Sequence, residues 1–326
     1  MRLLALVDRE TYLTKLSRVR FHSLEAIGRL CELRWSGPGW PGWDVALTVD
    51  ANVARSGWTP DLIEVYMPFG DQFAGNVSIK GIADTSIPVC LRYNEAFKVK
   101  RVKNEIESCR ADLVVFHHEN EMRPYLSLRW KHGRVSCAHI PHSAEPSIFR
   151  PYGEPKTTDL MLVGALGPRY PLRNRLAKLL PRFPRPYRAV AFEHPGYVHA
   201  DAHTDRYAER FARAISATQI CLSCSGRTRT RYGKYVEVPM CGTALAADMP
   251  EQDQDRIGKW LIELDLGMTD RQIIDKLVAH LEDPREMSRR VEAGLAWARQ
   301  YTQQHYAERF VAIAEEFVGQ RRSSGR

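Results

Sequence analysis

The sequence predicts an α/β protein of two domains, each built on a parallel sheet, and three observations lead to this. Short apolar runs, of which residues 2–7 (RLLALV) are the first, have the length and sharp bounds of buried parallel strands. They alternate along the chain with longer segments of helical periodicity. A length of 326 residues suits about two domains, and a segment with three prolines at 146–159 separates the halves.

In the first half, apolar residues at helical spacing predict a helix from Ser17 to Leu33. The segment before it lacks the glycines of a dinucleotide fingerprint, so NAD or FAD binding is not expected there. Glycine and proline at 37–44 indicate a turn, where Trp40 and Trp43 are expected to pack as a corner. Further strands are expected at 44–49, 62–67, 87–97, 112–121 and 135–145.

Polar side chains follow three of these strands: Arg92, Asn94 and Glu95, then His117, His118 and Glu119, then His142. In open parallel sheets ligands bind at the carboxyl ends of strands, so these residues form a candidate active-site rim. The alternative is three polar surface loops. Adjacent histidines at a strand end point to opposite faces, so we expect no metal site there.

In the second half, strands are expected from Leu160 onward and at 187–192, 219–224, 243–248 and 260–265. An amphipathic helix is expected at 203–218, two helices joined at Asp283-Pro284, and a last helix from His305 to Phe317. The D-x-D at Asp253 and Asp255 is interpreted as the acidic start of a helix rather than as a metal site.

The stretch 232–243 (YGKYVEVPMCGT) predicts a short helix after a basic loop with Arg227, Arg229 and Arg231. Lys234 and Glu237 are spaced i, i+3 and share one face. Cations at this end of a helix suit a diphosphate, and a carboxylate can accept from both hydroxyls of a ribose. The alternative is a surface helix with a local Lys–Glu pair and a glycine cap.

Composition restricts the class of protein further. The net charge of +8 and the pI near 9.1 suit an anionic partner, with nucleotide sugar, phosphorylated acceptor, acidic membrane surface and nucleic acid as the candidates. No apolar run approaches the ~20 residues of a membrane span, and the first apolar run is interpreted as a strand rather than a signal peptide, so a cytoplasmic location is expected. Seven cysteines at scattered spacings indicate no disulfide framework, and Cys221 and Cys224 are expected to be structural thiols.

The run KYVEVPMCGTALAADMPEQ resembles the segment K-x-x-E-A-x-A-x-G of retaining GT-B glycosyltransferases, which a strand and Pro-Glu follow. Glu237 matches the second of two glutamates in that family, which holds the nucleotide ribose. Arg229 stands where the family has the first glutamate. The arginine-rich version is closer to the sporulation-associated CgeB-like branch.

The resemblance implies a GT-B fold, in which two Rossmann-like domains with parallel sheets face each other across a cleft. Residues 135–317 match the family best. The implied organisation is an acceptor domain at 1–150, a nucleotide-sugar donor domain at 151–304, and a C-terminal helix at 305–326 that crosses back to the first domain and ends in a basic tail.

The resemblance also implies a metal-independent transferase of the hexosyltransferase type, without a cofactor, whose donor is a nucleotide-diphosphate sugar. The implied donor-binding residues are Glu237, Lys234, Arg169, Arg173, Arg231, Gly164 and Tyr232. A family histidine in the first domain matches Asn94, so the catalytic candidates are Asn94 and the following Glu95, with His117 and His118 as competitors.

Two other functions fit the sequence. One is a GT-B nucleotide-sugar epimerase, which needs paired acid and base carboxylates and no acceptor. The other is a non-catalytic nucleic-acid-binding protein, suggested by the positive charge. The identities of sugar, base and acceptor do not follow from the sequence; contact with the inner face of an anionic membrane is one candidate partner interaction.

Overall fold

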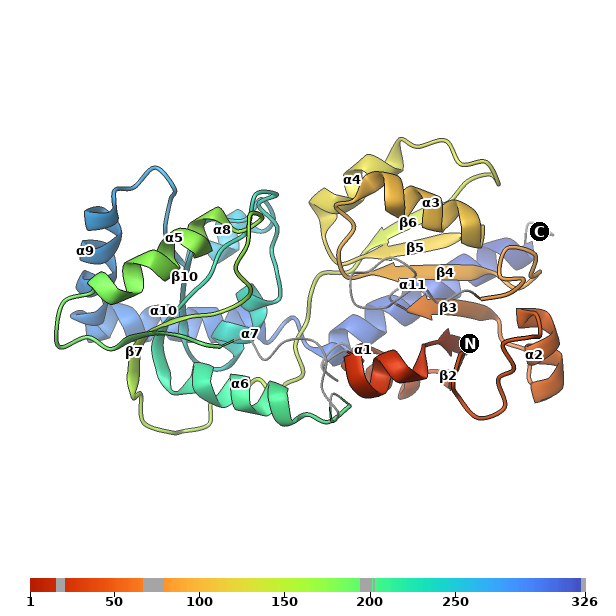
Figure 1. Ribbon diagram of the computed structural model, residues 1–326, viewed down its shortest axis with the longest axis horizontal. Coiled ribbons are helices and arrows are strands. Elements are labelled where there is room, and N and C mark those ends of the chain that lie inside the picture. Colours follow the sequence, from red (N-terminus) through yellow and green to blue (C-terminus); the bar gives the residue numbers. More distant parts are fainter. Residues whose placement is uncertain (16–20, 67–78, 194–200, 202, 324–326) are drawn as a thin grey trace. The chain divides into compact units, whose positions relative to one another are not determined.

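The computed structural model describes residues 1–15, 21–66, 79–193, 201 and 203–323 (Figure 1). It divides into two compact units, and each unit has its own sheet. The first unit consists of Met1–Pro141, Tyr197–Asp205 and Gln303–Arg326. The second consists of His142–Gly196 and Arg206–Thr302. The first unit is therefore discontinuous in sequence.

The first unit contains a six-stranded parallel sheet in the order β2-β1-β3-β4-β5-β6. Leu3 in β1 lies opposite Leu33 of β2 on one side and Leu62 of β3 on the other. Short apolar strands of this kind need cover on both faces, which the helices provide. The strands are β1 (Arg2–Leu6), β2 (Glu32–Ser36), β3 (Leu62–Tyr66), β4 (Val89–Tyr93), β5 (Leu113–Phe116) and β6 (Ser136–His139).

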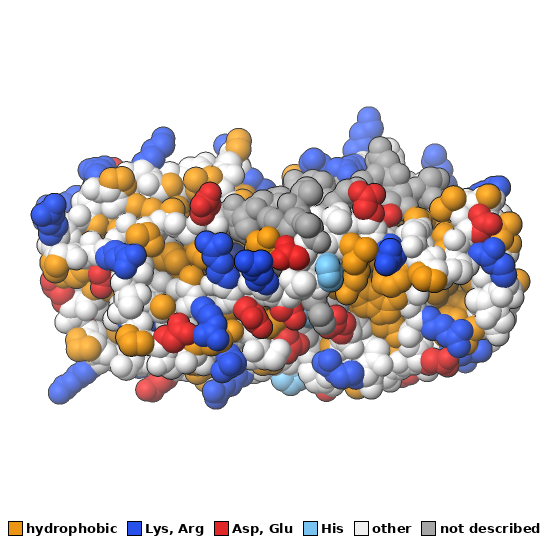
Figure 2. Space-filling view, turned by 60° about the horizontal axis from the view of Figure 1, so that its bottom comes forward, with side chains coloured by type: hydrophobic (Ala, Val, Ile, Leu, Met, Phe, Trp, Pro, Cys, Tyr) orange, Lys and Arg blue, Asp and Glu red, His pale blue; other side chains and the backbone are white. Residues whose placement is uncertain are grey.

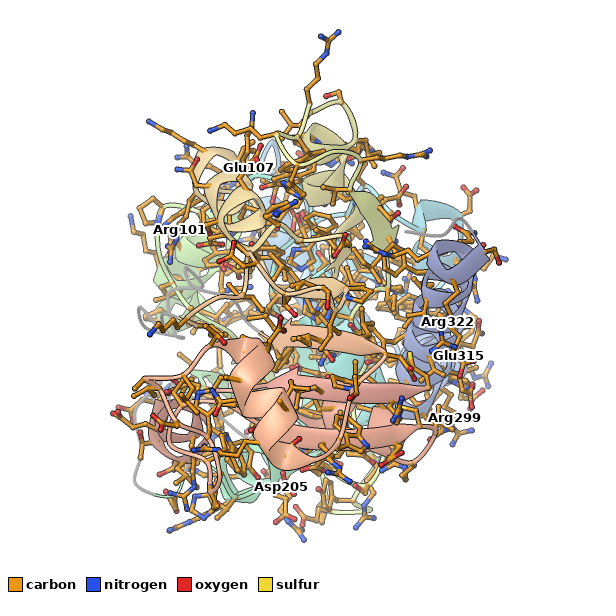
Figure 3. The ribbon with its side chains drawn as sticks, turned by 90° about the vertical axis from the view of Figure 1, so that its right-hand side faces the viewer. Arg101, Glu107, Asp205, Arg299, Glu315 and Arg322 are labelled. Atoms are coloured by element: carbon orange, nitrogen blue, oxygen red, sulfur yellow. The ribbon has the colours of Figure 1, made fainter. Side chains whose placement is uncertain are left out.

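Alternate residues of these strands enter two different hydrophobic cores, as the two-residue period of a strand requires. Leu91 and Val114 pack with the helices α2 (Val49–Ser56), α3 (Val99–Cys109) and α4 (Glu119–Leu126). Cys90 and Val115 pack with α1 (His22–Gly28) and α11 (Gln303–Ser323). Figure 3 labels residues of α3 and α11 and shows the two helices on opposite sides of the sheet.

The last helix is an integral part of the first unit. Tyr306, Phe310 and Ala314 of α11 are buried against β1, β3 and β5. Near its end, Arg321 pairs with Asp112, and Arg322 Nη2 lies 2.6 Å from Asp61 Oδ1. These contacts fix the final helix to the amino-terminal half of the chain.

The second unit contains a five-stranded parallel sheet in the order β11-β10-β9-β7-β8. Its core gathers apolar side chains from the strands and from α5, α9 and α10. The strands are β7 (Thr158–Leu162), β8 (Ala189–Ala191), β9 (Thr218–Leu222), β10 (Ala244–Ala247) and β11 (Ile262–Glu263). The helices are α5 (Pro171–Leu179), α6 (Arg206–Ser216), α7 (Lys234–Met240), α8 (Gln254–Ile257), α9 (Asp270–Leu281) and α10 (Pro284–Ala298).

Two sequence expectations in the first unit are wrong. The helix expected to reach Leu33 ends at Gly28, and Glu32–Ser36 forms the edge strand β2; the expected start at 17–20 lies outside the described residues. Residues 44–48 form turns instead of a strand, and α2 begins at Val49 after the cap of Thr48, whose side chain accepts a hydrogen bond from Ala51 N.

The expected tryptophan corner is confirmed. Trp40 Nε1 donates a hydrogen bond to Val7 O at 2.8 Å, and its ring contacts the ring of Tyr12. Trp43 packs against the core beneath α2 and α3. Hydrogen bonding of the indole nitrogen to the backbone allows such a ring to be half-buried at little cost.

The structure also bears on the thiols and on the surface. All seven cysteines are free, and burial raises the pKa of the Cys221 thiol to about 12, which suits a structural role. No helix of the described residues is long and apolar enough to cross a membrane. Lys and Arg side chains are interspersed with Asp and Glu over the face drawn in Figure 2.

Candidate functional site

The candidate donor site in the second unit is centred on Lys234 and Glu237 at the start of α7. Lys234 Nζ donates a hydrogen bond to Glu237 Oε2, which confirms the pair predicted from the i, i+3 spacing. The two side chains are 23% and 17% exposed, so both are sheltered and still accessible to a ligand. Lys234 Nζ also lies 4.4 Å from the ring centre of Phe211, which limits where the ammonium can move.

The backbone before Glu237 approaches its carboxylate closely. A Cβ added at Gly233 would lie 2.9 Å from Glu237 Oε1, closer than a side chain allows. Glycine at 233 therefore leaves the carboxylate room beside the chain. Glu237 N donates to Gly233 O at 2.8 Å, so the turn that carries the carboxylate is fixed by the backbone itself.

Asp248, which follows β10, fixes the basic loop before α7 through hydrogen bonds. Asp248 Oδ1 accepts from Ser225 N at 2.6 Å and Oδ2 accepts from Ser225 Oγ at 2.7 Å. The hydroxyl of Tyr235 in α7 donates to Asp248 O at 2.6 Å. One residue therefore fixes both the start of the loop and the helix that follows it.

A second loop, after β7, is joined to the basic loop through Arg169. Arg227 N donates to Arg169 O at 2.9 Å, and the Arg169 guanidinium lies 5.5 Å from the ring centre of Tyr232. The ring of Tyr232 in turn makes an edge contact with that of Tyr170. The side chain of Arg227 is exposed beside this junction. Arg169 and Tyr232, both predicted donor-binding residues, are thus brought together with an accessible cation.

Arg173 and Gly164 form a buried support beneath the loop after β7. Arg173 is 3% exposed and donates from Nη1 to Ala165 O at 2.5 Å and from Nη2 to Ser223 Oγ at 3.1 Å. Its guanidinium packs on the ring of Tyr170. Gly164 has φ +97°, and a Cβ there would lie 2.8 Å from Arg173 Nη1. Arg173 therefore positions the loop, and its contact with a diphosphate stays a prediction.

Arg231 is also buried, at 5% exposure, and its guanidinium lies 4.2 Å from the ring centre of Tyr301 and 5.2 Å from that of Trp297. The same two aromatic residues donate hydrogen bonds to Asp253 Oδ2, each at 2.9 Å. Asp253 precedes α8, as expected for an acidic helix start. The D-x-D segment thus forms part of a packed cluster. No group of three or more potential metal-ligating side chains occurs among the described residues.

In the first unit, the predicted rim residues follow β4 and β5. Asn94 is buried and Glu95 is half-buried. His117 Nε2 lies 3.0 Å from the hydroxyl of Tyr306 in α11, and His118 is 3% exposed. The two histidines therefore have different neighbours, as expected from the alternation of a strand end.

Glu121, which the sequence analysis did not identify, connects the two loops. Its Oε2 lies 3.0 Å from His118 Nδ1 and accepts a hydrogen bond from Ala96 N at 2.6 Å. Tyr125, one turn further along α4, donates to Ala96 O. The i, i+3 spacing of His118 and Glu121 was the available signal, but the strand expected at 112–121 placed both residues outside a helix, whereas α4 begins at Glu119.

The prediction that Arg92 belongs to the active-site rim is wrong. Arg92 is fully buried within β4, where Nε lies 2.5 Å from Glu64 Oε1 in β3 and Nη1 donates to Ser23 Oγ at 2.6 Å. Burial by itself lowers the pKa of Arg92, but the charge of Glu64 outweighs it and holds the pKa above its usual value. Burial also raises the pKa of Glu64, against the effect of Arg92. This pair belongs to the core. His142, the third predicted rim group, begins the second unit.

Comparison with known proteins gives a consistent fold but no close relative. No family model matches the sequence, and no curated protein matches it. Sucrose-phosphate synthase from Thermosynechococcus elongatus has a similar structure, with 13% identity, a TM-score of 0.65 and coverage of 98% of this chain and 100% of that chain. HepE from Anabaena, in complex with UDP and glucose, has 11% identity, a TM-score of 0.63 and coverage of 97% and 100%.

AviGT4, a glycosyltransferase involved in avilamycin A biosynthesis, has 13% identity and a TM-score of 0.54, with 98% of each chain covered. At these identities the likeness concerns the fold. Both parallel sheets and their helices are matched over nearly the whole chain. The chain therefore has the α/β fold of GT-B glycosyltransferases, as the sequence predicted.

Proposed function

We propose that this protein is a glycosyltransferase that takes a sugar from a nucleotide-diphosphate donor bound by the second unit. The observation that carries the proposal is the sheltered Lys234–Glu237 pair beside the two joined loops. A ribose and a diphosphate need an acceptor and cations a few ångströms apart, and this arrangement supplies both. The GT-B fold supports the reaction class, since its neighbours include sucrose-phosphate synthase and AviGT4.

Glu237 is the proposed acceptor for the two ribose hydroxyls. Its carboxylate is held by Lys234 and by the close approach of Gly233, so little conformational entropy is lost when a ligand binds. Lys234, Arg227 and Arg169 are the proposed cations for the diphosphate. Arg173 and Arg231 are buried against aromatic rings. We propose that their main role is to fix the loops around the donor, not to contact the diphosphate directly.

The chemistry proposed for these cations is stabilisation of the leaving group. When the bond between sugar and diphosphate breaks, negative charge grows on the leaving phosphate. Cations already fixed by the fold stabilise that charge without reorganisation, and no metal is needed in this scheme. Retention of anomeric configuration is proposed from the motif around Glu237 alone.

For the first unit, we propose that the polar residues after β4 and β5 bind the acceptor. Asn94, Glu95 and His118 are the candidates, and Glu121 orients His118. An imidazole is suited to take the proton of an acceptor hydroxyl near neutral pH. His117 is held by Tyr306 and is the second choice.

A thermal-shift panel of UDP, GDP, dTDP and ADP with their sugars tests the proposal. UDP and UDP-glucose come first, because crystals of HepE contain them. A ligand at about 100 times its Kd should stabilise the protein by about 2.7 kcal/mol. Glu237→Ala should lose most of this response. Glu292→Ala, which removes an exposed carboxylate from α10, should keep it.

Release of nucleoside diphosphate from the stabilising sugar nucleotide then tests catalysis. A wild type that none of the four nucleotides stabilises would contradict the donor site. Interconversion of the sugar nucleotide without an acceptor would instead indicate an epimerase.

A further inference from the structure

The first unit carries a surface on which cations are exposed and carboxylates are not. Between residues 98 and 134, all of them described, the sequence has nine Lys or Arg and five Asp or Glu, a net charge of +4 that is half of the total of +8. None of the five carboxylates is exposed. Seven of the nine cations are exposed: Lys98, Lys100, Arg110, Arg123, Arg129, Lys131 and Arg134.

Four of the five carboxylates in this stretch, those of Glu105, Glu107, Asp112 and Glu121, accept hydrogen bonds within the first unit. Glu105 accepts from the Tyr93 hydroxyl at 2.8 Å and from Arg101 Nε at 3.2 Å. Asp112 accepts from Val89 N at 2.9 Å and pairs with Arg321. Local acids therefore neutralise little of the exposed positive charge.

Hydrogen bonds join α3 with the residues before it, α4, and residues 127–134 into one continuous surface. At one end, Ala96 before α3 is bonded to Glu121 and Tyr125 of α4. At the other end, the Glu107 carboxylate in α3 accepts from Lys131 N at 3.1 and 3.2 Å and lies 3.4 Å from His132 Nδ1. We call the exposed surface of residues 97–110, α4 and residues 127–134 the basic face. Figure 3 shows Arg101 and Glu107 on the α3 side, away from α11.

The basic face also exposes large apolar side chains. Leu126 is 60% exposed and Phe97 is 40% exposed, although most large apolar side chains of the first unit are buried. Their neighbours Tyr125 and Ala96 are hydrogen-bonded to each other, so the two side chains extend from adjoining backbone segments. A surface groove of about 640 Å³ on α3 is lined by Lys98, Val99, Lys100, Arg101, Asn104, Glu105 and Ser108.

We propose that the basic face binds an anionic membrane surface, with the lysine and arginine side chains against lipid phosphates and with Leu126 and Phe97 entering the interface. Cations that surround exposed apolar side chains are the combination that peripheral lipid binding uses, since charge attracts the surface and apolar burial holds it. The inference is independent of the proposed transferase activity.

Nucleic acid is the other large polyanion, but the face suits it less well. Binding of single strands depends on aromatic side chains on which bases stack, interleaved with cations. Between residues 97 and 134 Phe97 is the single exposed aromatic side chain, since Tyr125 is buried and Trp130 packs against the core, and the most exposed apolar residue of the face, Leu126, is aliphatic. An aliphatic side chain gains by entering lipid and gains nothing from a base.

Vesicle flotation of the full chain tests this proposal. Wild type should float with phosphatidylcholine vesicles that contain phosphatidylglycerol and should not float with phosphatidylcholine alone. Added salt should release it, because screening shortens the range of exposed charges to about 8 Å at physiological ionic strength. Each cation near such a surface contributes about fivefold in partitioning, so Lys100→Ser with Arg129→Ser should weaken binding about 25-fold.

The matched control is Arg29→Ser with Arg309→Ser, which removes the same charge from exposed positions at the end of α1 and on α11, across the sheet. This variant should float like wild type. Phe97→Ser with Leu126→Ser should weaken flotation at unchanged charge. Thermal unfolding of each variant confirms that it is folded.

Three results would overturn the proposal: no flotation of wild type with anionic vesicles, equal loss in the control and the basic-face variant, or binding of a single-stranded oligonucleotide in place of vesicles.

Discussion

The carboxylate of Glu121 joins two loops of the first unit, with Oε2 3.0 Å from His118 Nδ1 and 2.6 Å from the nitrogen of Ala96. The first loop follows β5 and the second follows β4. Because one oxygen contacts both loops, the buried side chain of Glu121 contributes directly to the placement of His118 relative to Asn94 and Glu95.

Glu121→Gln tests whether this contact positions the catalytic candidates. The amide keeps an acceptor for Ala96 N but loses the charge beside His118, so kcat should fall while KM for the donor changes little. The pH profile of kcat should also shift, because the substitution removes a charge beside the catalytic candidates. Glu121→Ala should additionally cost about 1–3 kcal/mol of unfolding free energy, since a buried N–H loses its acceptor. Steady-state kinetics over pH and urea unfolding measure the two effects. A loss of stability in Glu121→Gln without any kinetic change would assign Glu121 a structural role only.

The sugar of the nucleotide provides a sharper test of Glu237 than loss of binding. Wild type should bind a ribonucleoside diphosphate about tenfold or more tightly than its 2′-deoxy analogue, because a hydrogen bond to a charged group contributes about 1.5–3 kcal/mol. Glu237→Ala should bind the two nucleotides with similar affinity, and titration calorimetry measures all four values. Equal discrimination in wild type and variant would remove Glu237 from the ribose site.

Gly164 is constrained by its positive φ and by the neighbouring Arg173 guanidinium, and a control variant separates the two effects. Gly164→Ala should lower the free energy of unfolding by about 1–3 kcal/mol, because alanine is strained at the positive φ of this position. The loss should be larger still because the added Cβ would collide with the Arg173 guanidinium. Gly153→Ala is the matched control, because Gly153 has φ +72° and a Cβ added there would have nothing within 4 Å. Urea unfolding of both variants gives the difference. Equal losses would mean that Arg173 moves aside freely.

The ion pairs of Glu286 with its neighbouring arginines make the free energy of unfolding depend on pH. Glu286 accepts two hydrogen bonds from Arg289, each at 2.7 Å, and lies 2.7 Å from Arg290 Nε; the two arginines, Arg289 first, lower its pKa from 4.5 to about 2. Since the folded pKa is below the unfolded value, the ionised carboxylate favours the folded state above pH 4.5, and this contribution is lost as the pH falls toward 2. The stability difference between wild type and Glu286→Gln should therefore shrink between about pH 6 and pH 2. Urea midpoints of both proteins across this range measure it; a constant difference would contradict the assignment.

Much of the fold was predictable because its strands are short, apolar and sharply bounded. The edge strand β2 was not, since Leu30 and Leu33 continue the helical spacing of Leu24 and Ile27. Local periodicity cannot show that residues 32–36 pair with β1, because that pairing is a contact distant in sequence. The strand expected at 44–49 failed for a related reason: Thr48 caps a helix that the apolar residues before it do not suggest.

The site was predictable where it is local. The Lys234–Glu237 pair follows from helix geometry, and the sequence contains both residues within four positions. Arg92 was misplaced because its partner Glu64 is on a neighbouring strand 28 residues earlier, and no local pattern indicates that a charge is neutralised in the core. The burial of Arg231 on Tyr301 and Trp297 depends in the same way on residues far along the chain.

The return of α11 to the first unit reverses the order in which the two halves can mature during synthesis on the ribosome. Leu3, Ile27 and Val115 share a hydrophobic core with side chains between residues 306 and 318, which follow the whole second unit in the chain. The second unit is nearly contiguous and has all its strands by Glu263, so it can form while the first still awaits its final helix. A nascent chain stalled before Gln303 should therefore expose the apolar surface of the amino-terminal half to chaperones and proteases.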